Sequence, residues 1–211
     1  MLDIEQVLVG KMVVFCYVLR DRATNACAVV DPAFDTGRIL EVVNSMGAKV
    51  THVINTHGHA DHVCGNQAMV RATGAKVCIH KDDAPKLRKL VYRTMALGIG
   101  GKSSPAADVL LEHGDTIQVG ESMIDVIHTP GHSPGGICLL HQGKVLTGDT
   151  LFVGGIGTTA FPGGDHTRLL RSIRTRLYTL PDDTIVLPGH NYGPTPESTI
   201  GIEKATNPFT R

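Results

Sequence analysis

Four short apolar runs in this sequence end in the same way, at a glycine that lies next to a histidine or an aspartate. Runs of this length and composition are typical of buried strands. Where strands of an open α/β structure end at the same edge of a sheet, the side chains that follow them meet and form sites. The runs and their endings are Val53-Ile54 before THGHADH (56–62), Val126-Ile127 before PGH (130–132), Val145-Leu146 before TGD (147–149) and Ile185-Val186-Leu187 before PGH (188–190).

The order of the predicted elements indicates a layered fold of strands and helices. The second half carries closely spaced strands separated by glycines, which is typical of an antiparallel meander. A Gly/Ser/Pro segment at 98–107 is a candidate active-site lid, and 188–211 is expected to pack as an ordered tail. The expected strands are 12–20, 26–30, 49–56, 76–80, 116–119, 123–128, 136–141, 144–147 and 184–187, and the expected helices are 35–46, 62–73 and 166–179.

The length of 211 residues favours one domain over 1–211. A chain of this size buries about 70% of its unfolded surface, so it needs no disulfide or metal merely to fold. The five cysteines are an odd number without a CxxC pair, which predicts a reducing, cytoplasmic setting. Asp3 and Glu5 argue against a signal peptide, and the apolar stretch 12–19 is too short to span a bilayer.

Charge and aromatic content narrow the classes of binding partner that this chain can have. Twenty Lys and Arg balance twenty Asp and Glu, whereas nucleic-acid or acidic-membrane binding by bulk charge needs a cationic surplus. Five Phe, four Tyr and no Trp argue against a base-stacking platform. We therefore expect a small-molecule partner, with no nucleic acid and no membrane, and leave the oligomeric state open. The eleven histidines direct attention to metal binding.

The histidines and aspartates that follow the apolar runs have the spacing of metal ligands. Neutral imidazole and carboxylate are the groups that bind zinc in catalytic sites. One tetrahedral ion cannot use seven ligands, but two ions that share one carboxylate can, and each keeps room for water. The seven candidates are His57, His59, Asp61, His62, His132, Asp149 and His190.

Other residues in the same pattern have simpler interpretations. We expect six histidines to be surface or core residues without a function: His52, His80, His113, His128, His141 and His166. Asp31 either hydrogen-bonds a ligand histidine or closes a strand-end turn. Residues 53–59 (VINTHGH) and 126–132 (VIHTPGH) match at five of seven positions, which suggests two similar halves that each deliver a histidine at a strand end.

The motif THGHADH, followed by PGH, GDT and PGH, resembles the metallo-β-lactamase superfamily from Asp31 to His190. The segment GHNYGPTPESTIGIEKATNPF (189–209) is similar to the glyoxalase II-like (hydroxyacylglutathione hydrolase-like) subgroup of that superfamily. The resemblance implies a four-layer αββα sandwich. It also implies a metallo-hydrolase that acts on small acyl thioesters such as S-lactoylglutathione.

The resemblance further implies a role for each candidate. His57, His59 and His132 would hold one divalent ion, Asp61, His62 and His190 a second, and Asp149 would bridge the two. A hydroxide between the ions would attack the carbonyl, and the catalytic Asp61 would orient or deprotonate it. Zinc is the expected metal, with iron or manganese as alternatives, because all three accept histidine and carboxylate.

Three further functions stay open. Persulfide dioxygenases share the HxHxDH motif and bind one iron through the residues matching His57, His132 and Asp149, a set typical of non-haem iron oxygenases. That family carries an arginine and an aspartate in the loop where this chain has Thr158-Thr159-Ala160, which argues against it. The same loop lacks the basic residue that helps hold glutathione in glyoxalase II. The second open function is the hydrolysis of lactones or esters, and the third is metal binding without turnover.

Overall fold

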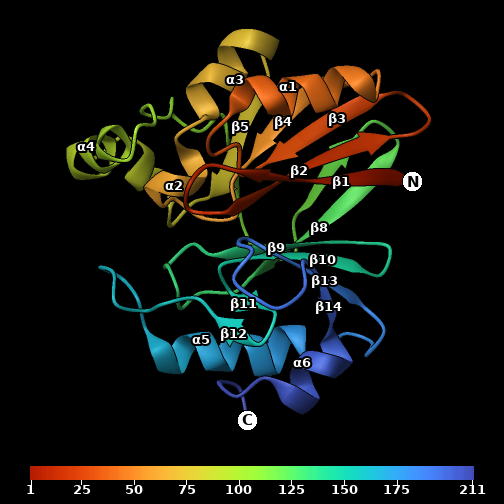
Figure 1. Cartoon of the computed structure of the whole chain (residues 1–211), viewed down its shortest axis with the longest axis vertical. Coiled ribbons are helices and arrows are strands. Elements are labelled where there is room, and N and C mark those ends of the chain that lie inside the picture. Colours follow the sequence, from red (N-terminus) through yellow and green to blue (C-terminus); the bar gives the residue numbers. More distant parts are fainter.

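Two six-stranded β-sheets pack face to face in the computed structural model, which describes residues 1–211. Helices cover the outer face of each sheet, so that the layers run helix, sheet, sheet, helix (Figure 1). The four-layer αββα sandwich expected from the sequence is therefore confirmed. None of the helices combines the length and the apolar character that crossing a lipid bilayer requires.

The first sheet contains the strands of the N-terminal half in sequential order. The first three strands pair antiparallel, and the last four pair parallel through helical crossovers. The four strands expected in this half are present, and an N-terminal strand that the sequence pattern did not predict pairs along the whole length of β2. The strands are β1 (Leu2–Val9), β2 (Val14–Asp21), β3 (Ala26–Val30), β4 (Lys49–Ile54), β5 (Lys76–His80) and β6 (Val109–Leu111).

The second sheet is built around the expected meander. Its order is β14-β13-β10-β9-β8-β7, in which β7 to β10 are antiparallel neighbours and β13 pairs parallel with β10. A small hairpin of β11 (Leu151–Phe152) and β12 (Gly155–Ile156) follows β10. The sheet strands are β7 (Thr116–Val119), β8 (Ser122–His128), β9 (Ile137–His141), β10 (Lys144–Gly148), β13 (Ile185–Pro188) and β14 (Ser198–Thr199).

The helices differ more from the sequence-based expectation than the strands do. The expected helix 62–73 is two helices, α2 (Ala60–Val63) and α3 (Asn66–Thr73), because the chain breaks at Gly65. A Cβ on Gly65 would lie 2.0 Å from the carbonyl oxygen of Pro32, so only glycine allows this approach. The remaining α-helices are α1 (Thr36–Ser45), α4 (Leu90–Gly98), α5 (His166–Ser172) and α6 (Ile200–Thr206), with a 3₁₀ turn at Ala84–Leu87 and a π-helical turn at Ile173–Leu177.

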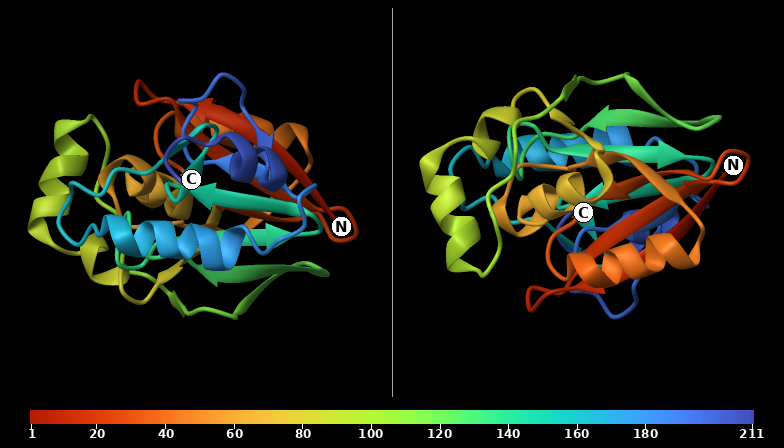
Figure 2. Two further views of the ribbon diagram at one scale, coloured as in Figure 1. Left: turned by 90° about the horizontal axis from the view of Figure 1, so that it is seen from below. Right: turned by 90° about the horizontal axis from the view of Figure 1, so that it is seen from above.

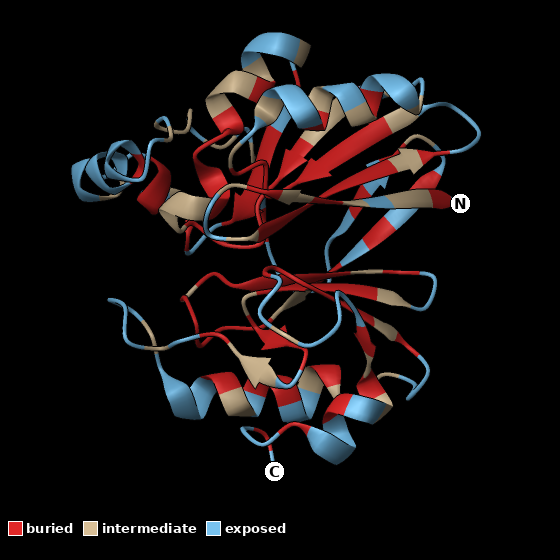
Figure 3. Cartoon of the chain, viewed as in Figure 1, coloured by how far each residue is buried: buried red, intermediate tan, exposed pale blue.

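Three apolar clusters hold the four layers together. One lies between the sheets and includes Leu19, Ile54 and Leu139. A second packs the first sheet against α1 and α3, and a third packs α5 and its π-helical turn against the second sheet. Figure 3 shows the same division, with buried strands inside and exposed faces on the outer helices. Each Å² of apolar surface that is buried contributes about 25 cal/mol to the free energy of folding, so these clusters are the main source of stability.

The ends of the strands place the functional loops at one side of the sandwich. The loops after β4 and β5 in the first sheet and after β8, β10 and β13 in the second carry the residues discussed below. Helix α4 and the segment 157–165 extend from the same end of the molecule in each view (Figure 2). The segment 98–107, expected to be a lid, is tied back by hydrogen bonds from Lys102 N–H to the Cys64 carbonyl and from Asn66 Nδ2 to Ser104 Oγ. Its closing motion stays a prediction.

Candidate metal centre

The structure brings all seven predicted ligands to one place between the two sheets. The ligand atoms of His57, His59 and His132 lie within 4.8 Å of one another, and so do those of Asp61, His62 and His190. Asp149 lies between these two groups: Oδ2 is 3.5 Å from His132 Nε2 and 3.4 Å from His190 Nε2, and Oδ1 is 3.4 Å from His62 Nε2. Ligation by each residue stays a prediction, but the geometry offers two three-residue groups around a shared carboxylate.

The loops that carry these residues are joined by backbone hydrogen bonds. Ile137 N–H donates to the Thr56 carbonyl, which links the loop after β4 to the second sheet. The His190 loop is held against the start of β2, because Phe15 N–H donates to the Gly189 carbonyl and Asn191 N–H donates to the Val13 carbonyl. Both sheets therefore contribute to the position of the centre.

Four of the five predicted ligand histidines are oriented by an oxygen close to Nδ1. His62 Nδ1 lies 3.0 Å from Asp31 Oδ2, His132 Nδ1 2.6 Å from the Thr158 carbonyl, and His190 Nδ1 2.9 Å from the Met12 carbonyl. His57 Nδ1 lies 3.1 Å from Thr56 Oγ1. An oxygen acceptor places the ring proton on Nδ1 and leaves the lone pair on Nε2 for a metal, as ligand histidines require.

Asp31 connects two of these histidines. Its Oδ1 accepts the Thr56 backbone N–H at 2.8 Å, and its Oδ2 accepts both the Thr56 hydroxyl at 2.6 Å and the His62 ring. Because the Thr56 hydroxyl donates to Asp31, its oxygen is free to accept the proton of His57 Nδ1. Of the two interpretations of Asp31, the structure thus favours the hydrogen bond to a predicted ligand histidine, His62.

Electrostatics divide the centre into two halves. Burial opposes a charge on His62, but the carboxylates of Asp149, Asp61 and Asp31 outweigh it and raise the pKa of His62 to about 10. Burial lowers the pKa of His59 to about 3, and nearby His132 acts in the same direction. One half is therefore rich in negative charge that attracts cations, and the other offers neutral rings whose lone pairs can bind them.

The side chains at this centre fit divalent metal ions. Asp149 is buried, yet the rings of His62, His190 and His132 hold the pKa of its carboxyl well below its usual range, against the effect of burial. Its Oδ1 and the Nε2 of His59 are buried without a hydrogen-bond partner, which is costly unless a cation compensates. Imidazole nitrogens and carboxylate oxygens together suit zinc, iron and manganese.

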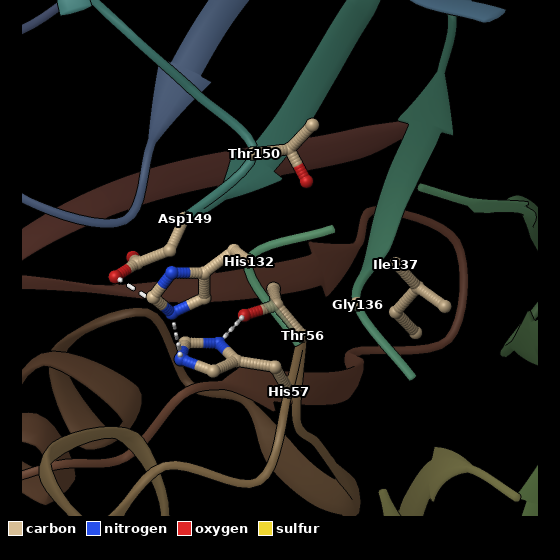
Figure 4. Close-up of a pocket in the computed structure, with 7 residues that line it drawn as sticks. All are labelled: Thr56, His57, His132, Gly136, Ile137, Asp149 and Thr150. Carbon is tan, nitrogen blue, oxygen red and sulfur yellow. Dashed lines mark hydrogen bonds and ion pairs between the residues drawn. The ribbon is translucent and has the colours of Figure 1, made fainter. Parts of the chain in front are cut away.

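A small pocket reaches three of the predicted ligands. Thr56, Gly136, Ile137 and Thr150 line it together with His57, His132 and Asp149. In Figure 4, His132 lies between Asp149 and His57, and His57 in turn lies against Thr56. Nε2 of His132 is 3.2 Å from Nε2 of His57.

Two exposed aromatic rings flank the centre. Phe161 is 50% exposed and its ring lies edge-on to His59, with centroids 5.2 Å apart. Tyr192 is 58% exposed and stacks on His190 at 4.5 Å. Apolar surface of this kind beside a metal centre is suited to contact with a bound organic molecule.

The sequence pattern did not reveal Asp83, a fully buried carboxylate beside the centre. Its partners are backbone amides 25 and 52 residues away, so no motif marks it. A further group, His80, Asp82 and His128, lies outside the centre. One ring nitrogen of each histidine is engaged, because His80 Nδ1 accepts the Asp82 N–H and His128 Nε2 bonds the Pro134 carbonyl. This agrees with the structural role expected for His80 and His128.

Comparison with known proteins finds a matching family model and similar named enzymes. The family model described as "Metallo-beta-lactamase superfamily" matches residues 9–190. The hydroxyacylglutathione hydrolase GloC of Haemophilus influenzae is 33% identical over 203 residues, which cover 92% of this chain and 91% of GloC. The mitochondrial persulfide dioxygenase ETHE1 of Homo sapiens is 29% identical over 197 residues, covering 92% of this chain and 70% of that protein.

A solved structure with a metal pair is also similar. The protein TTHA1623, crystallised in a di-iron-bound form, superposes with a TM-score of 0.84 at 30% identity. The match covers 97% of this chain and 99% of TTHA1623. The similar proteins thus include a named hydrolase, a named dioxygenase and a structure in a di-iron-bound form.

Proposed function

Since the chain belongs to the metallo-β-lactamase superfamily, we propose that it is a metal-dependent hydrolase of small acyl thioesters, of the S-lactoylglutathione class. The observation that carries the proposal is the arrangement of two ligand groups around Asp149, the pattern expected for two ions that share one carboxylate. The similarity to GloC along 92% of this chain supports the substrate class.

The candidate ligands divide into two positions. His57, His59 and His132 would hold one divalent ion, and Asp61, His62 and His190 a second. Divalent ions bound there would supply Lewis acidity and lower the pKa of water from 15.7 to about 7. Zinc, iron and manganese all suit the donor set.

Asp61 is the residue proposed to handle the proton. Its carboxylate is 16% exposed and lies 3.6 Å from His190 Nε2 and 3.7 Å from His62 Nε2, so it faces both the second ligand group and solvent. It would accept a proton from the attacking water and aim the oxygen at the thioester carbonyl. The C–O bond forms, the C–S bond breaks, and the proton held by Asp61 would pass to the leaving thiolate, so that the products are a carboxylic acid and a thiol.

One observation favours a second candidate, a persulfide dioxygenase that uses a single iron. His57, His132 and Asp149 lie together as two imidazoles and a carboxylate, the ligand set of non-haem iron oxygenases (Figure 4). The similarity to ETHE1 of Homo sapiens supports this candidate, whereas Thr158-Thr159-Ala160 replaces the arginine and aspartate expected for it.

A pair of assays tests the proposal. We expect the metal-loaded protein to release thiol from S-lactoylglutathione without consuming oxygen. Consumption of oxygen with glutathione persulfide, together with no thioester turnover, would establish the second candidate instead. Turnover of esters or lactones alone would keep the hydrolytic reaction but replace the substrate class.

The variant His190→Ala separates the two schemes further. A two-ion hydrolase needs His190 for its second ion, so the variant should lose one ion per chain and most of its activity. A one-iron enzyme does not use His190 and should stay nearly as active.

We also propose a cytoplasmic location, which the five free buried cysteines support because thiols persist in a reducing compartment.

A further inference from the structure

The buried Asp83 carboxylate connects the two loops that carry one ligand group. Its Oδ2 accepts the Gly58 N–H at 2.8 Å, and Gly58 lies between His57 and His59 in the chain. Its Oδ1 accepts the Gly135 N–H at 2.9 Å, and Gly135 follows His132 by three residues. One side chain at the end of the first sheet thus bonds to the backbone of both loops.

The packing around Asp83 leaves little freedom for these loops. A Cβ on Gly135 would lie 2.6 Å from the backbone nitrogen and 2.7 Å from the Cβ of Asp83. A Cβ on Gly58 would lie 3.0 Å from the side chain of Lys86 and 3.1 Å from the Asp83 carbonyl oxygen. The Asp83 turn therefore leaves no room for a Cβ at Gly135 and little room for one at Gly58.

Lys86 balances the charge of this carboxylate. Its Nζ lies 2.9 Å from Asp83 Oδ1, and its side chain is only 7% exposed. Burial would raise the pKa of the Asp83 carboxyl, but Lys86 and the Gly58 amide outweigh burial and hold the pKa below its usual range. Asp83 is thus ionised at neutral pH, and an ionised carboxylate accepts hydrogen bonds more strongly than a neutral group does.

We propose that Asp83 is a positioning residue that joins the Gly58 and Gly135 amides and so holds His57, His59 and His132 as one ligand set. The inference rests on the metal centre of the proposed function. Asp83 makes no hydrogen bond to the loop of His190, whose ring is oriented instead by the Met12 carbonyl, nor to His62, whose ring is oriented by Asp31. Its influence should therefore be selective for one of the two ligand groups.

The test uses Asp83→Asn in the full chain. An asparagine side chain has one acceptor oxygen and one donor NH₂, so one of the two glycine amides would face a donor. Zn²⁺ affinity is measured by competition with a chromophoric chelator at about pH 8, where carboxylates are ionised. His190→Ala isolates the group of His57, His59 and His132 (the His57 group) in this titration. His132→Ala isolates the group of Asp61, His62 and His190.

We expect Asp83→Asn to weaken Zn²⁺ binding to the isolated His57 group by about 10- to 100-fold, the usual effect of losing an outer-shell partner. Binding to the other group should change by less than about threefold, within the range of context effects. Equal weakening of both groups, or of neither, would overturn the inference. If the unmodified chain bound none of Zn²⁺, Fe²⁺ and Mn²⁺ at either group, the proposed function would fail and the inference with it.

Two further variants separate positioning from charge burial. Lys86→Met removes the ammonium but keeps the carboxylate and its hydrogen bonds from the Gly58 and Gly135 amides. Zn²⁺ affinity should therefore be retained. Asp83→Asn combined with Lys86→Met leaves no unpaired buried charge, so the chain should stay folded. The hydrogen bonds from the two glycine amides are still disturbed in this double variant. The double variant should reproduce the selective loss, and the same loss in Lys86→Met alone would show that only the ion pair matters.

Discussion

Asp31, which follows β3, and His62, in helix α2 after the neighbouring strand β4, are joined by a hydrogen bond of 3.0 Å between Oδ2 and Nδ1. Both side chains are almost completely buried, and Asp31 adopts a left-handed backbone with φ of 49°. A non-glycine residue in that region carries a conformational cost that surrounding contacts must offset. The two hydrogen bonds from Thr56 to the same carboxylate supply such contacts.

Replacing Asp31 by asparagine should therefore weaken the metal centre. Asparagine keeps the shape, but its NH₂ group would meet a donor from either Thr56 or His62. We expect a loss of about 10- to 100-fold in metal affinity or activity. Zn²⁺ titration and thiol release on the same preparation measure both quantities, and an unchanged affinity would show that His62 needs no partner at Nδ1.

Replacing Asp61 by asparagine should be among the single changes that damage the reaction most. The change keeps the side-chain volume but removes the charge that accepts a proton, and loss of a general base costs about 10²- to 10⁴-fold in rate. The rate of thiol release is compared at saturating Zn²⁺, with the metal content of each sample measured. A fully loaded variant with near-normal turnover would assign Asp61 to loop structure alone.

The strand ends were predictable from the sequence because their signal is local. A buried apolar run, a glycine and a ligand-type residue lie within about ten residues, and parallel crossovers must bring such ends to one edge. The predicted ligands therefore converge as expected, and their ligand roles stay predictions. The loops that the repeat 53–59 and 126–132 describes do face each other, one from β4 and one from β8.

The elements that the sequence did not predict lacked that local signal. Helix α4 exposes Leu90 and Leu97 rather than burying them, so its apolar residues mark no inner face. Strand β1 is interrupted by polar residues because it lies at the edge of the first sheet, and the short helix α6 begins only where Thr199 caps it. Asp83 was missed for another reason: its role depends on backbone amides distant in sequence.

The break at Gly65 yields a stability prediction. In Gly65→Ala the new methyl group would collide with the Pro32 and Ala33 carbonyls, and forcing extra volume into packed structure costs about 1–3 kcal/mol. Gly37→Ala is the matched control, since no atom lies within 4 Å of its Cβ and alanine suits helix α1. The control should gain about 0.4–1 kcal/mol. Urea unfolding measures both, and equal stabilities would contradict the collision.

The exposed ring of Phe161 should contribute to substrate binding. Phe161→Ala removes the aromatic surface beside His59, and a ring contact of this kind contributes about 0.5–1.5 kcal/mol. We expect KM to rise by about 2- to 12-fold with kcat little changed. Phe209→Ala is the control, because Phe209 is 55% exposed but lies in the C-terminal segment. A fall in kcat at constant KM would show that Phe161 acts on His59 rather than on the substrate.

The stacked rings of His80 and His128 should make stability depend on pH. Their centroids are 3.9 Å apart, and burial together with the neighbouring ring lowers the pKa of His80. Burial also lowers the pKa of His128, and nearby Arg176 adds to this shift although the Pro134 carbonyl opposes it. A ring whose pKa is lower in the folded than in the unfolded chain favours folding above the unfolded value, about 6.5.

That contribution is lost as the pH falls from about 6.5 through the folded pKa, because protonation then favours the unfolded chain. In His128→Gln one titrating ring and its repulsion of His80 are gone, while the glutamine amide can still donate to the Pro134 carbonyl. The free energy of unfolding should therefore fall less between about pH 7 and about pH 5 in the variant than in the unmodified chain. Urea unfolding of both proteins is measured at the same Zn²⁺ concentration, so that protonation of the metal centre contributes equally to both. Parallel pH profiles of the free energy of unfolding would show that the stacked pair is not the titrating element.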